Sequence, residues 1–445
     1  MQERQQEAQG RNQATERQEG VRALGNTEHL FWLLDQNRPT HFALVAEVDG
    51  QIATEAWRDG LLTLQQRHPL LSARIATNEQ MYPCFYAAPG VTIPLRVVEK
   101  AHASWQAEVA AELATPFDPS TAPLVRATLL QGGEVSTLIL VAHHAVADGM
   151  ASSFLIGDLL RALSGQRLAT LELAQPLEVL LNDEVLAAPV SPPTPLAPTP
   201  KSFRPVESAV AHVEGIALSR ELTAQLVARA RNEQTTLYGV IAVAVHEGAR
   251  RLSPEWCRHP VRTATPIDVR HFSSDIGTAA GAYITQTVTV DGHQRGAPFW
   301  EMARTIKRNV ACAQTREATV AQLKDLQATM ATRPSVHDAA EYLSAVLAFD
   351  LLLSNLGNDP IPSAYGRLKL NALWGPMVTS GFSDDQVVGV CTVDGVLRLT
   401  QTSHSAIPGL LEAVREVLEI AVRTNGGESQ MVSATGTCSS YSVSE

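Results

Sequence analysis

A proline-rich stretch near the middle of the chain constrains the fold more than any other feature. The segment AAPVSPPTPLAPTPK, Ala187 to Lys201, holds six prolines. Because proline has no amide hydrogen and a fixed φ, such a segment acts as an extended connector rather than as part of a helix or sheet. It divides the 445 residues into two halves of similar size. A chain of this length also exceeds one ordinary core, so two folded units are expected.

The remaining boundaries follow from composition. Residues rich in Gln, Glu and Arg open the chain, and small polar residues close it, so both ends are predicted to be disordered tails. The predicted organisation is therefore a tail at 1–22, a folded half at 23–186, a linker at 187–205, a second folded half at 206–424 and a tail at 425–445.

Composition also excludes several classes of protein. The formal charge of −11 and the pI near 5.7 argue against a nucleic-acid-binding surface. Five scattered cysteines with no CxxC pair suit a reducing compartment. The N-terminus lacks the apolar core of a secretory signal, and no stretch approaches the roughly 20 apolar residues of a membrane span. We therefore expect a cytoplasmic protein with no membrane span and no nucleic-acid partner.

Hydrophobic periodicity predicts a mixture of strands and helices in the first half. THFALVAEVDG (40–50) alternates as a strand does, and in residues 53–71 an amphipathic helix is expected with Ala53, Trp57, Leu61, Leu62 and Leu64 on one face, ending at Pro69. Residues 115–144 indicate a turn and two strands joined by a Gly-Gly hairpin. A further helix, with Met150, Phe154, Leu155 and Leu159 on one face, is expected to stop at Gly165.

The second half repeats this mixture. Residues 219–252 predict two helices split by a turn, and 408–424 predict a closing helix. Strands are expected at 281–290, 367–375 and 395–403. The order of these elements indicates an α/β or α+β fold with two halves.

The segment VAHHAVADGM, Val141 to Met150, lies where the strand STLILVA meets the next helix. Three interpretations of this segment are open. The first is a metal site, but such a site would need a third ligand at the usual spacing, and no HxH or HExxH is present. A second interpretation is that both histidines are satisfied core residues at a strand end. The third assigns His143 to packing, His144 to a cavity, Asp148 to fixing the loop, and Gly149 to close backbone approach. Neither a GxSxG elbow nor a phosphate-binding glycine loop occurs.

The stretch HHAVADG resembles the HHxxxDG signature of the condensation-domain-like acyltransferase superfamily. That superfamily includes nonribosomal peptide condensation domains, chloramphenicol acetyltransferase, plant BAHD acyltransferases and the mycobacterial polyketide-associated acyltransferases, and the pattern is most similar to the stand-alone polyketide-associated group. Four further stretches agree in order: RHPLLSARI (67–75), PFDPSTAPLVRATLL (116–130), PIDVRHF (266–272) and IGTAAGAYITQTVTV (276–290). The plant-type DFGWG stretch is absent, and SGFSDDQ (380–386) is only a distant echo of it.

The resemblance implies a fold and an activity. The fold would be α/β, with two chloramphenicol-acetyltransferase-like subdomains forming a pseudo-dimer around a tunnel. The activity would be that of an acyltransferase of the EC 2.3.1 type, moving a polyketide or fatty acyl group from a thioester to an alcohol. Two alternatives stay open: a free-standing condensation enzyme that forms an amide from a carrier-bound amine, and a non-catalytic carrier-binding relative.

The resemblance also implies a role for each site residue. His144 would be the general base, since an imidazole with a pKa near ~6.5 can accept a proton at neutral pH. Asp148 would pair with Arg270 and shape the loop, and the Gly149 amide would donate toward an oxyanion. His143 would pack beside them. No metal and no cofactor is implied beyond the thioester on phosphopantetheine or coenzyme A.

The expected partners are an acyl carrier protein or acyl-coenzyme A, together with a small alcohol or amine. The protein itself is expected to be a monomer. Carrier proteins are acidic, so an acidic enzyme would need a local basic patch to attract one. Two clusters are candidates: Arg250, Arg251 and Arg258, and Arg304, Lys307 and Arg308. The alternative for each cluster is an ordinary solvated helix face.

Overall fold

The computed structural model describes residues 21–181, 210–291 and 297–423. The proline-rich linker predicted at 187–205 and nearly all of both predicted tails lie outside these ranges. Arg22, at the end of the predicted tail 1–22, lies within the described ranges and pairs with Phe85 in a short β-ladder.

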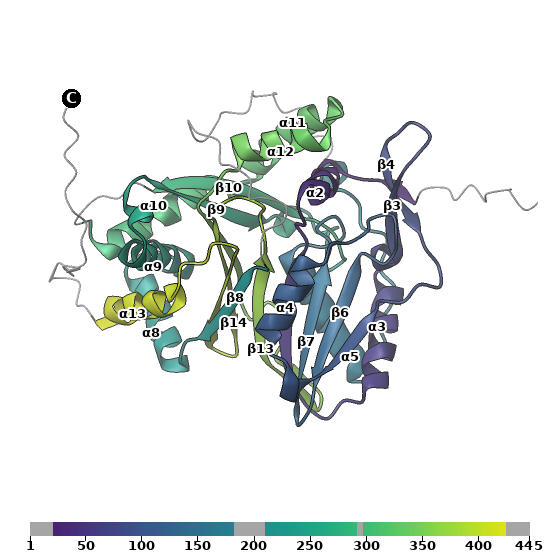
Figure 1. The fold of residues 1–445 in the computed structure, drawn as a ribbon, viewed down its shortest axis with the longest axis horizontal. Coiled ribbons are helices and arrows are strands. Elements are labelled where there is room, and N and C mark those ends of the chain that lie inside the picture. Colours follow the sequence, from purple (N-terminus) through teal and green to yellow (C-terminus); the bar gives the residue numbers. More distant parts are fainter. Residues whose placement is uncertain (1–20, 182–209, 292–296, 424–445) are drawn as a thin grey trace, which may run out of the picture.

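Two six-stranded sheets form the centres of the two halves (Figure 1). The first has the order β12 (Ala364–Tyr365), β13 (Leu368–Val378), β2 (Phe42–Asp49), β7 (Val135–Ala142), β6 (Val125–Gln131) and β5 (Leu95–Glu99). The second has the order β10 (Ile284–Asp291), β9 (Val261–Asp268), β11 (Leu351–Asn358), β14 (Gln386–Val393), β15 (Val396–Ser403) and β8 (His212–Ala217). A small third sheet holds β1 (Arg22–Ala23), β4 (Pro83–Ala87) and β3 (Ala73–Thr77).

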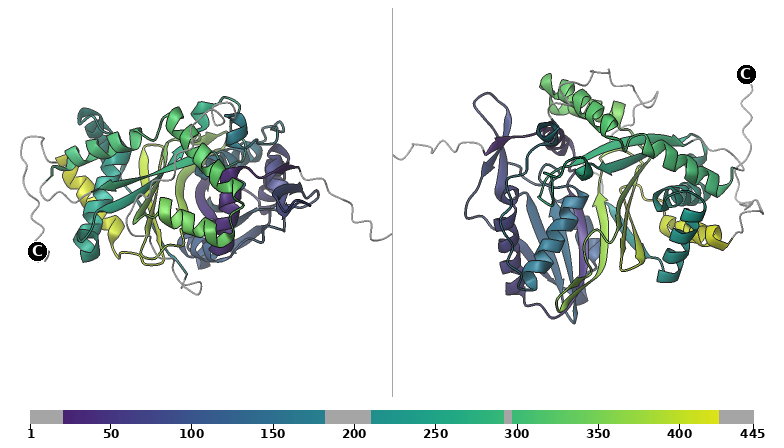
Figure 2. Two further views of the ribbon diagram at one scale, coloured as in Figure 1. Left: turned by 90° about the horizontal axis from the view of Figure 1, so that it is seen from above. Right: turned by 180° about the vertical axis from the view of Figure 1, so that it is seen from behind.

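Helices cover the outer faces of both large sheets (Figures 1 and 2). The first half contains α2 (Asn26–Asn37), α3 (Thr54–Arg67), α4 (Trp105–Ala114), α5 (Gly149–Leu163) and α6 (Leu177–Leu180). The second half contains α8 (Arg220–Asn232), α9 (Leu237–Leu252), α10 (Phe299–Ala311), α11 (Arg316–Ala331), α12 (Val336–Val346) and α13 (Leu410–Arg423). Short 3₁₀ turns lie at η1 (Pro69–Ser72), η2 (Lys100–His102), η3 (Pro254–Cys257) and η4 (Arg270–Phe272). The expected α/β class with two sheet-rich halves is confirmed.

Most predicted elements lie where periodicity placed them, with local corrections. Helix α3 ends at Arg67 before Pro69, and α5 ends at Leu163, just before Gly165 with its positive φ of 85°. The predicted apolar face of α3 is wrong at Leu62, which is 44% exposed, and at Ala53, the exposed N-cap. Leu62 lies about 100° around the helix from buried Leu61, so the two side chains cannot both face the core.

Strand β2 differs from the half-exposed strand that its alternation predicts, because both of its faces are buried. Phe42 and Leu44 join the core that α3 and α5 cover. Ala43 and Val45 join a second core under α4, with Trp374 of β13. Alternating apolar and polar residues are expected only where one face of a strand is exposed to water. Strand β2 lies in the middle of a sheet that is covered on both sides, so neither of its faces needs to be polar.

The C-terminal half of the sequence contributes two strands to the N-terminal sheet. Strands β12 and β13 come from the C-terminal half but complete the N-terminal sheet, where β13 runs antiparallel to β2. At the irregularity of β13, the backbone of Gly375 and Pro376 lies directly against Gly389 of β14 in the other sheet. Strand β13 therefore belongs to the first sheet and contacts the second. The boundary between the two sheets does not coincide with the linker predicted from the sequence.

We predict that Gly389→Ala destabilises this junction by about 1–3 kcal/mol, the usual cost of overpacking. A Cβ at this position would lie 2.3 Å from the Pro376 carbonyl oxygen and 2.6 Å from Thr400 Oγ1. The free energy of unfolding, measured by urea denaturation, gives the comparison with wild type. Gly248→Ala is the control, since its added carbon meets nothing closer than 3.3 Å. Equal losses in the two variants would contradict the close approach.

Candidate functional site

The HHAVADG turn is anchored at the end of the central strand β7. This strand is paired with β2 on one side and β6 on the other, so its end is held in place. The His143 amide donates to the Leu124 carbonyl at 3.0 Å, and the Val146 amide donates to the His143 carbonyl at 3.0 Å. The turn then leads directly into α5, and adjacent histidines leave it in different directions.

His143 is fully buried and lies away from the cavity. Its Nδ1 accepts a hydrogen bond from the Ala145 amide at 3.1 Å, and its Nε2 lies 3.5 Å from Asp35 Oδ2. The ring of Phe117 contacts it edge-on, with centroids 6.2 Å apart. These contacts are those of a packing residue that orients the turn.

Asp35 of α2 is a site residue that the sequence interpretation missed. It accepts the Thr40 amide at 2.9 Å and lies beside two histidines, His41 and His143. Burial alone would raise the pKa of Asp35, but the neighbouring His143 and His41 side chains and the Thr40 amide hold this pKa well below its usual range. A charged aspartate thus links α2 to the turn. In the sequence, the indication of this role is that Asp35 is a charged residue within the mostly apolar run FWLLDQ.

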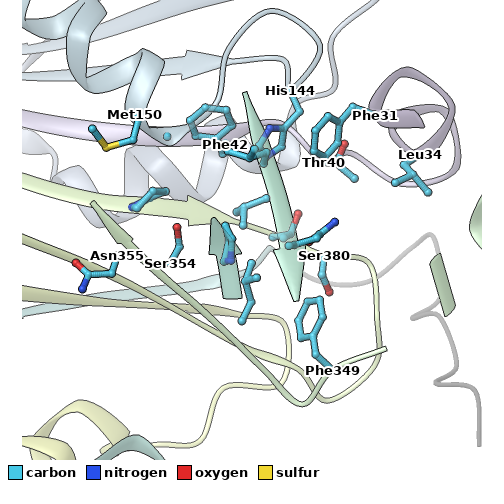
Figure 3. Close-up of a pocket in the computed structure, with 18 of the residues that line it drawn as sticks. Phe31, Leu34, Thr40, Phe42, His144, Met150, Phe349, Ser354, Asn355 and Ser380 are labelled. Atoms are coloured by element: carbon cyan, nitrogen blue, oxygen red, sulfur yellow. The ribbon is translucent and has the colours of Figure 1, made fainter. Parts of the chain in front are cut away.

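His144 faces the cavity between two aromatic rings (Figure 3). Phe31 stacks on the imidazole with centroids 4.3 Å apart and planes 11° apart, and Phe42 contacts it at 4.5 Å with a tilt of 36°. Burial lowers the pKa of His144 to about 4, although the negative charges of Asp148 and Asp35 act in the opposite direction. The imidazole is therefore neutral at pH 7 and able to accept a proton.

The cavity lies where the two halves meet, and it encloses about 1030 Å³ of space, its open mouth included. From the first half come Phe31 and Leu34 of α2, Thr40, Phe42 of β2, and His144, Gly149 and Met150. From the C-terminal half come strands β9, β10, β11 and β13, helix α12, and the loops beside them. Their lining residues are Pro266, Asp268, Ile284, Gln286, Leu343, Phe349, Leu352, Ser354, Asn355, Leu356, Pro376, Val378, Thr379 and Ser380. Most of the wall is apolar, with a few polar groups from the second sheet.

Asp148 is buried and joins the two halves through its carboxylate. Arg270 Nη2 donates to both carboxylate oxygens at 2.9 Å, and the Tyr283 amide donates to Oδ2 at 2.7 Å. The same group caps α5, because Oδ1 accepts the Ala151 amide at 2.8 Å. The carboxylate is thus surrounded by donors and lies outside the cavity wall, which leaves it no role as the base.

Arg270 is shared between two carboxylates. Its Nη1 donates to Asp268 Oδ1 at 2.6 Å, while Nη2 bonds Asp148. Burial alone would lower the pKa of the Arg270 guanidinium, but the charges of Asp148 and Asp268 raise it. The rings of Tyr283 and Phe154 lie 5.2 and 5.7 Å from the guanidinium carbon. The arginine is therefore held charged in a nearly dry position.

Gly149 is the first residue of α5 and lines the cavity. A Cβ at this position would lie 2.9 Å from Pro376 Cγ and 3.1 Å from Leu356 Cδ2. The glycine is therefore needed sterically, since α5 begins directly against strands of the C-terminal half. The absent side chain also leaves the backbone at the helix N-terminus accessible from the cavity.

The two basic clusters are largely engaged in structural contacts. The Arg250 side chain is only 6% exposed and lies 3.6 Å from Glu247, so it cannot contribute to a docking surface. Arg304 pairs with Glu233 at 3.0 Å, and Lys307 donates to the Gln234 carbonyl at 2.9 Å. Arg304 and Lys307 thus stabilise the turn between α8 and α9, whereas the side chain of Arg250 is largely buried and fits neither a docking patch nor a solvated helix face.

No group of three or more His, Cys, Asp or Glu side chains in the described ranges is placed to hold a metal ion. No helix among the described residues is long and apolar enough to cross a membrane.

A pair of sheet-rich halves that meet at a cavity, with an HHxxxDG turn at its wall, is the arrangement that the sequence resemblance implies. The family model of the condensation domain matches residues 19–175, about a third of the chain. This match confirms the resemblance to the condensation-domain-like superfamily. It supports condensation or acyl transfer as the class of reaction.

The curated relatives are large synthetases of which this chain spans a small part. Malpibaldin synthetase of Mortierella alpina is 32% identical over 146 residues, which are 31% of this chain and 3% of that protein. A phosphinothricin tripeptide synthetase of Streptomyces viridochromogenes is 29% identical over 177 residues, 37% of this chain and 16% of that protein.

Solved structures extend the likeness in fold to nearly the whole chain. Polyketide synthase associated protein 5 from Mycobacterium tuberculosis has a TM-score of 0.64 at 17% identity, covering 92% of this chain and 99% of that one. The first condensation domain of the CDA synthetase has a TM-score of 0.68 at 16% identity, with coverages of 91% and 97%. Trichothecene 15-O-acetyltransferase from Fusarium sporotrichioides has a TM-score of 0.66 at 13% identity, with coverages of 91% and 95%.

We expect the bond between Asp148 and Arg270 to be strongly stabilising as a pair. Arg270→Ala should lower the free energy of unfolding by about 3–5 kcal/mol, because it leaves the buried Asp148 carboxylate without its partner. Asp148→Asn should also be destabilising but less so, since Arg270 keeps its bond to Asp268. The double variant should lose about 0.5–3 kcal/mol less than the sum of the two. Additive losses in chemical denaturation would contradict the coupling. Arg258→Ala is the control, since its pair with Glu255 is exposed and should be worth less than about 1 kcal/mol.

A second prediction concerns pH. The pKa of His144 is about 4 in the folded chain against an ordinary 6.5, so as pH falls the unfolded chain binds this proton first. Stability should therefore decrease from pH 6.5 to 4, by up to about 1.4 kcal/mol per pH unit from this group. His144→Gln should flatten that part of the stability curve, whereas His102→Gln, at an exposed position, should not. Parallel curves for wild type and His144→Gln would contradict the shifted pKa.

Proposed function

We propose that the chain is an acyltransferase that moves a polyketide or fatty acyl group from a thioester to an alcohol, forming an ester. The thioester is carried on the phosphopantetheine of a carrier protein or on coenzyme A. The observation that carries the proposal is the neutral His144 imidazole at the wall of a cavity between the two halves. Two subdomains, at 23–186 and 206–424, would act as one monomer around a tunnel that includes this cavity.

The proposed reaction needs one base and one oxyanion donor. The acceptor hydroxyl gives its proton to His144 as its oxygen bonds to the acyl carbon. The carbonyl oxygen becomes an oxyanion, to which the Gly149 amide at the start of α5 donates, in a place where the helix dipole also favours negative charge. The carbon–sulfur bond then breaks, and the departing thiolate takes the proton back from the imidazolium.

Asp148, Arg270 and His143 support this reaction without touching the substrate. The ion pair sets where α5 begins and therefore where the Gly149 amide lies. His143 and Asp35 hold the turn from the other side. The charges of Asp148 and Asp35 also favour the imidazolium as it forms, since both raise the pKa of His144 against the larger effect of burial.

An amine acceptor, giving an amide, is the second candidate. The observation in its favour is that one of the curated relatives is a tripeptide synthetase. The same base and cavity would serve, with the amine nitrogen in place of the hydroxyl oxygen.

Intact-mass spectrometry of an acylated carrier protein tests the proposal. The full chain is incubated with an octanoyl carrier protein or octanoyl-coenzyme A and a panel of primary alcohols and amines. We expect loss of the octanoyl mass from the donor together with formation of an ester. Amide formation would favour the second candidate. An unchanged donor with every acceptor would leave the non-catalytic alternative.

We predict that His144→Ala lowers the rate of acyl transfer by about 10²–10⁴-fold, the contribution of one positioned base. The fold should be retained, as measured by circular dichroism. His143→Ala should instead lower the melting temperature, because buried Asp35 loses a hydrogen-bond partner. Loss of activity without a change in melting for His143→Ala, and the reverse for His144→Ala, would exchange the two assignments.

A further inference from the structure

The floor of the cavity is the face of three neighbouring strands of the second sheet. Strand β9 lies between β10 and β11, and Asp268 is the register partner of Ile284, while Pro266 is the partner of Gln286. Side chains along a strand alternate between its two faces, so every second residue of these strands faces the cavity. Asp268, Gln286, Ser354 and Asn355 are the polar members of this floor.

Asp268 is the one acidic side chain among the described residues of the cavity wall, and that wall contains no Lys or Arg. Its Oδ1 accepts from Arg270 Nη1 at 2.6 Å, whereas no described residue bonds its Oδ2. The side chain is 37% exposed, in contrast to the buried Asp148. One oxygen of the carboxylate is thus available to a bound molecule.

The charges around this position do not cancel. Asp148 and Asp268 share the single guanidinium of Arg270, so the three groups together carry a net charge of −1. The partly exposed member of the set is Asp268, and the rest of the wall is mostly apolar. An apolar, partly desolvated wall strengthens an electrostatic interaction, so this end of the cavity favours a cation and disfavours the phosphates of coenzyme A.

We propose that the cavity binds an acceptor that carries a protonated amine, with Asp268 Oδ2 accepting a hydrogen bond from the ammonium. This inference rests on the proposed function and deepens it, because it makes the acceptor an amino alcohol rather than a neutral one. The ammonium anchors the molecule and is not the nucleophile, since its nitrogen has no free electron pair. The hydroxyl at the other end is the group that His144 deprotonates. Gln286 and Ser354, on the strands beside Asp268, supply further polar contacts to the anchored end.

A matched pair of acceptors tests the proposal: 6-amino-1-hexanol and 1-heptanol, which have the same number of non-hydrogen atoms and differ in charge. With octanoyl-N-acetylcysteamine as donor, we expect the KM of wild type to be about tenfold lower for the amino alcohol, the size of one hydrogen bond to a charged group. Asp268→Asn keeps an oxygen for Arg270 but removes the charge, so the KM ratio should fall to about one. Asp275→Asn is the control, an exposed aspartate outside the cavity wall, and should keep the wild-type ratio.

A binding measurement separates this inference from the proposed function. Ligand-observed NMR titration of the full chain with each alcohol, without donor, should give tighter binding of 6-amino-1-hexanol to wild type and loss of that preference in Asp268→Asn. This result would support the ammonium site even if no acyl transfer occurred. Acyl transfer to both alcohols with equal KM values, or a preference for the amino alcohol that survives in Asp268→Asn, would overturn the inference and leave the proposed function standing.

Discussion

The ion pair between Asp148 and Arg270 is the contact on which the rest of the site depends. Asp148 belongs to the turn after β7, and Arg270 to the turn after β9 in the other sheet. The carboxylate also accepts the Tyr283 amide and caps α5, so one buried group holds three segments in register. Because a buried charge is costly without its partner, the two halves can separate here only at a large loss of stability.

This anchor lets two adjacent histidines serve different purposes. His143 lies among buried polar groups, where the Ala145 amide donates to its Nδ1 and Asp35 lies 3.5 Å from its Nε2. His144 lies between two phenylalanine rings at the cavity wall, where burial lowers its pKa. One turn thus combines a fixed backbone with a neutral imidazole, and the same Arg270 that anchors it leaves a carboxylate oxygen of Asp268 without a bond from the described residues.

Sequence patterns predicted the strongly periodic elements and the HHxxxDG turn, but not every residue that completes the site. Asp35 and Phe31 lie in α2, more than a hundred residues before His144, and reach it only through packing of that helix. The basic character of Arg250 suggested a surface patch, whereas the fold buries its side chain beside Glu247. Charge is visible in a sequence, but exposure depends on which elements pack together.

The sequence by itself determined the α/β class, the two sheet-rich halves and the resemblance to the condensation-domain-like superfamily, because hydrophobic periodicity and a short contiguous motif are local properties. Only the tertiary structure decided that β13 crosses into the first sheet and that the cavity wall draws on both halves. The same holds for Asp268, which shares an arginine with Asp148 from 120 residues away in the chain. These pairings join segments that are distant in the sequence. They depend on which surfaces pack together in the folded chain, so no local sequence pattern predicts them.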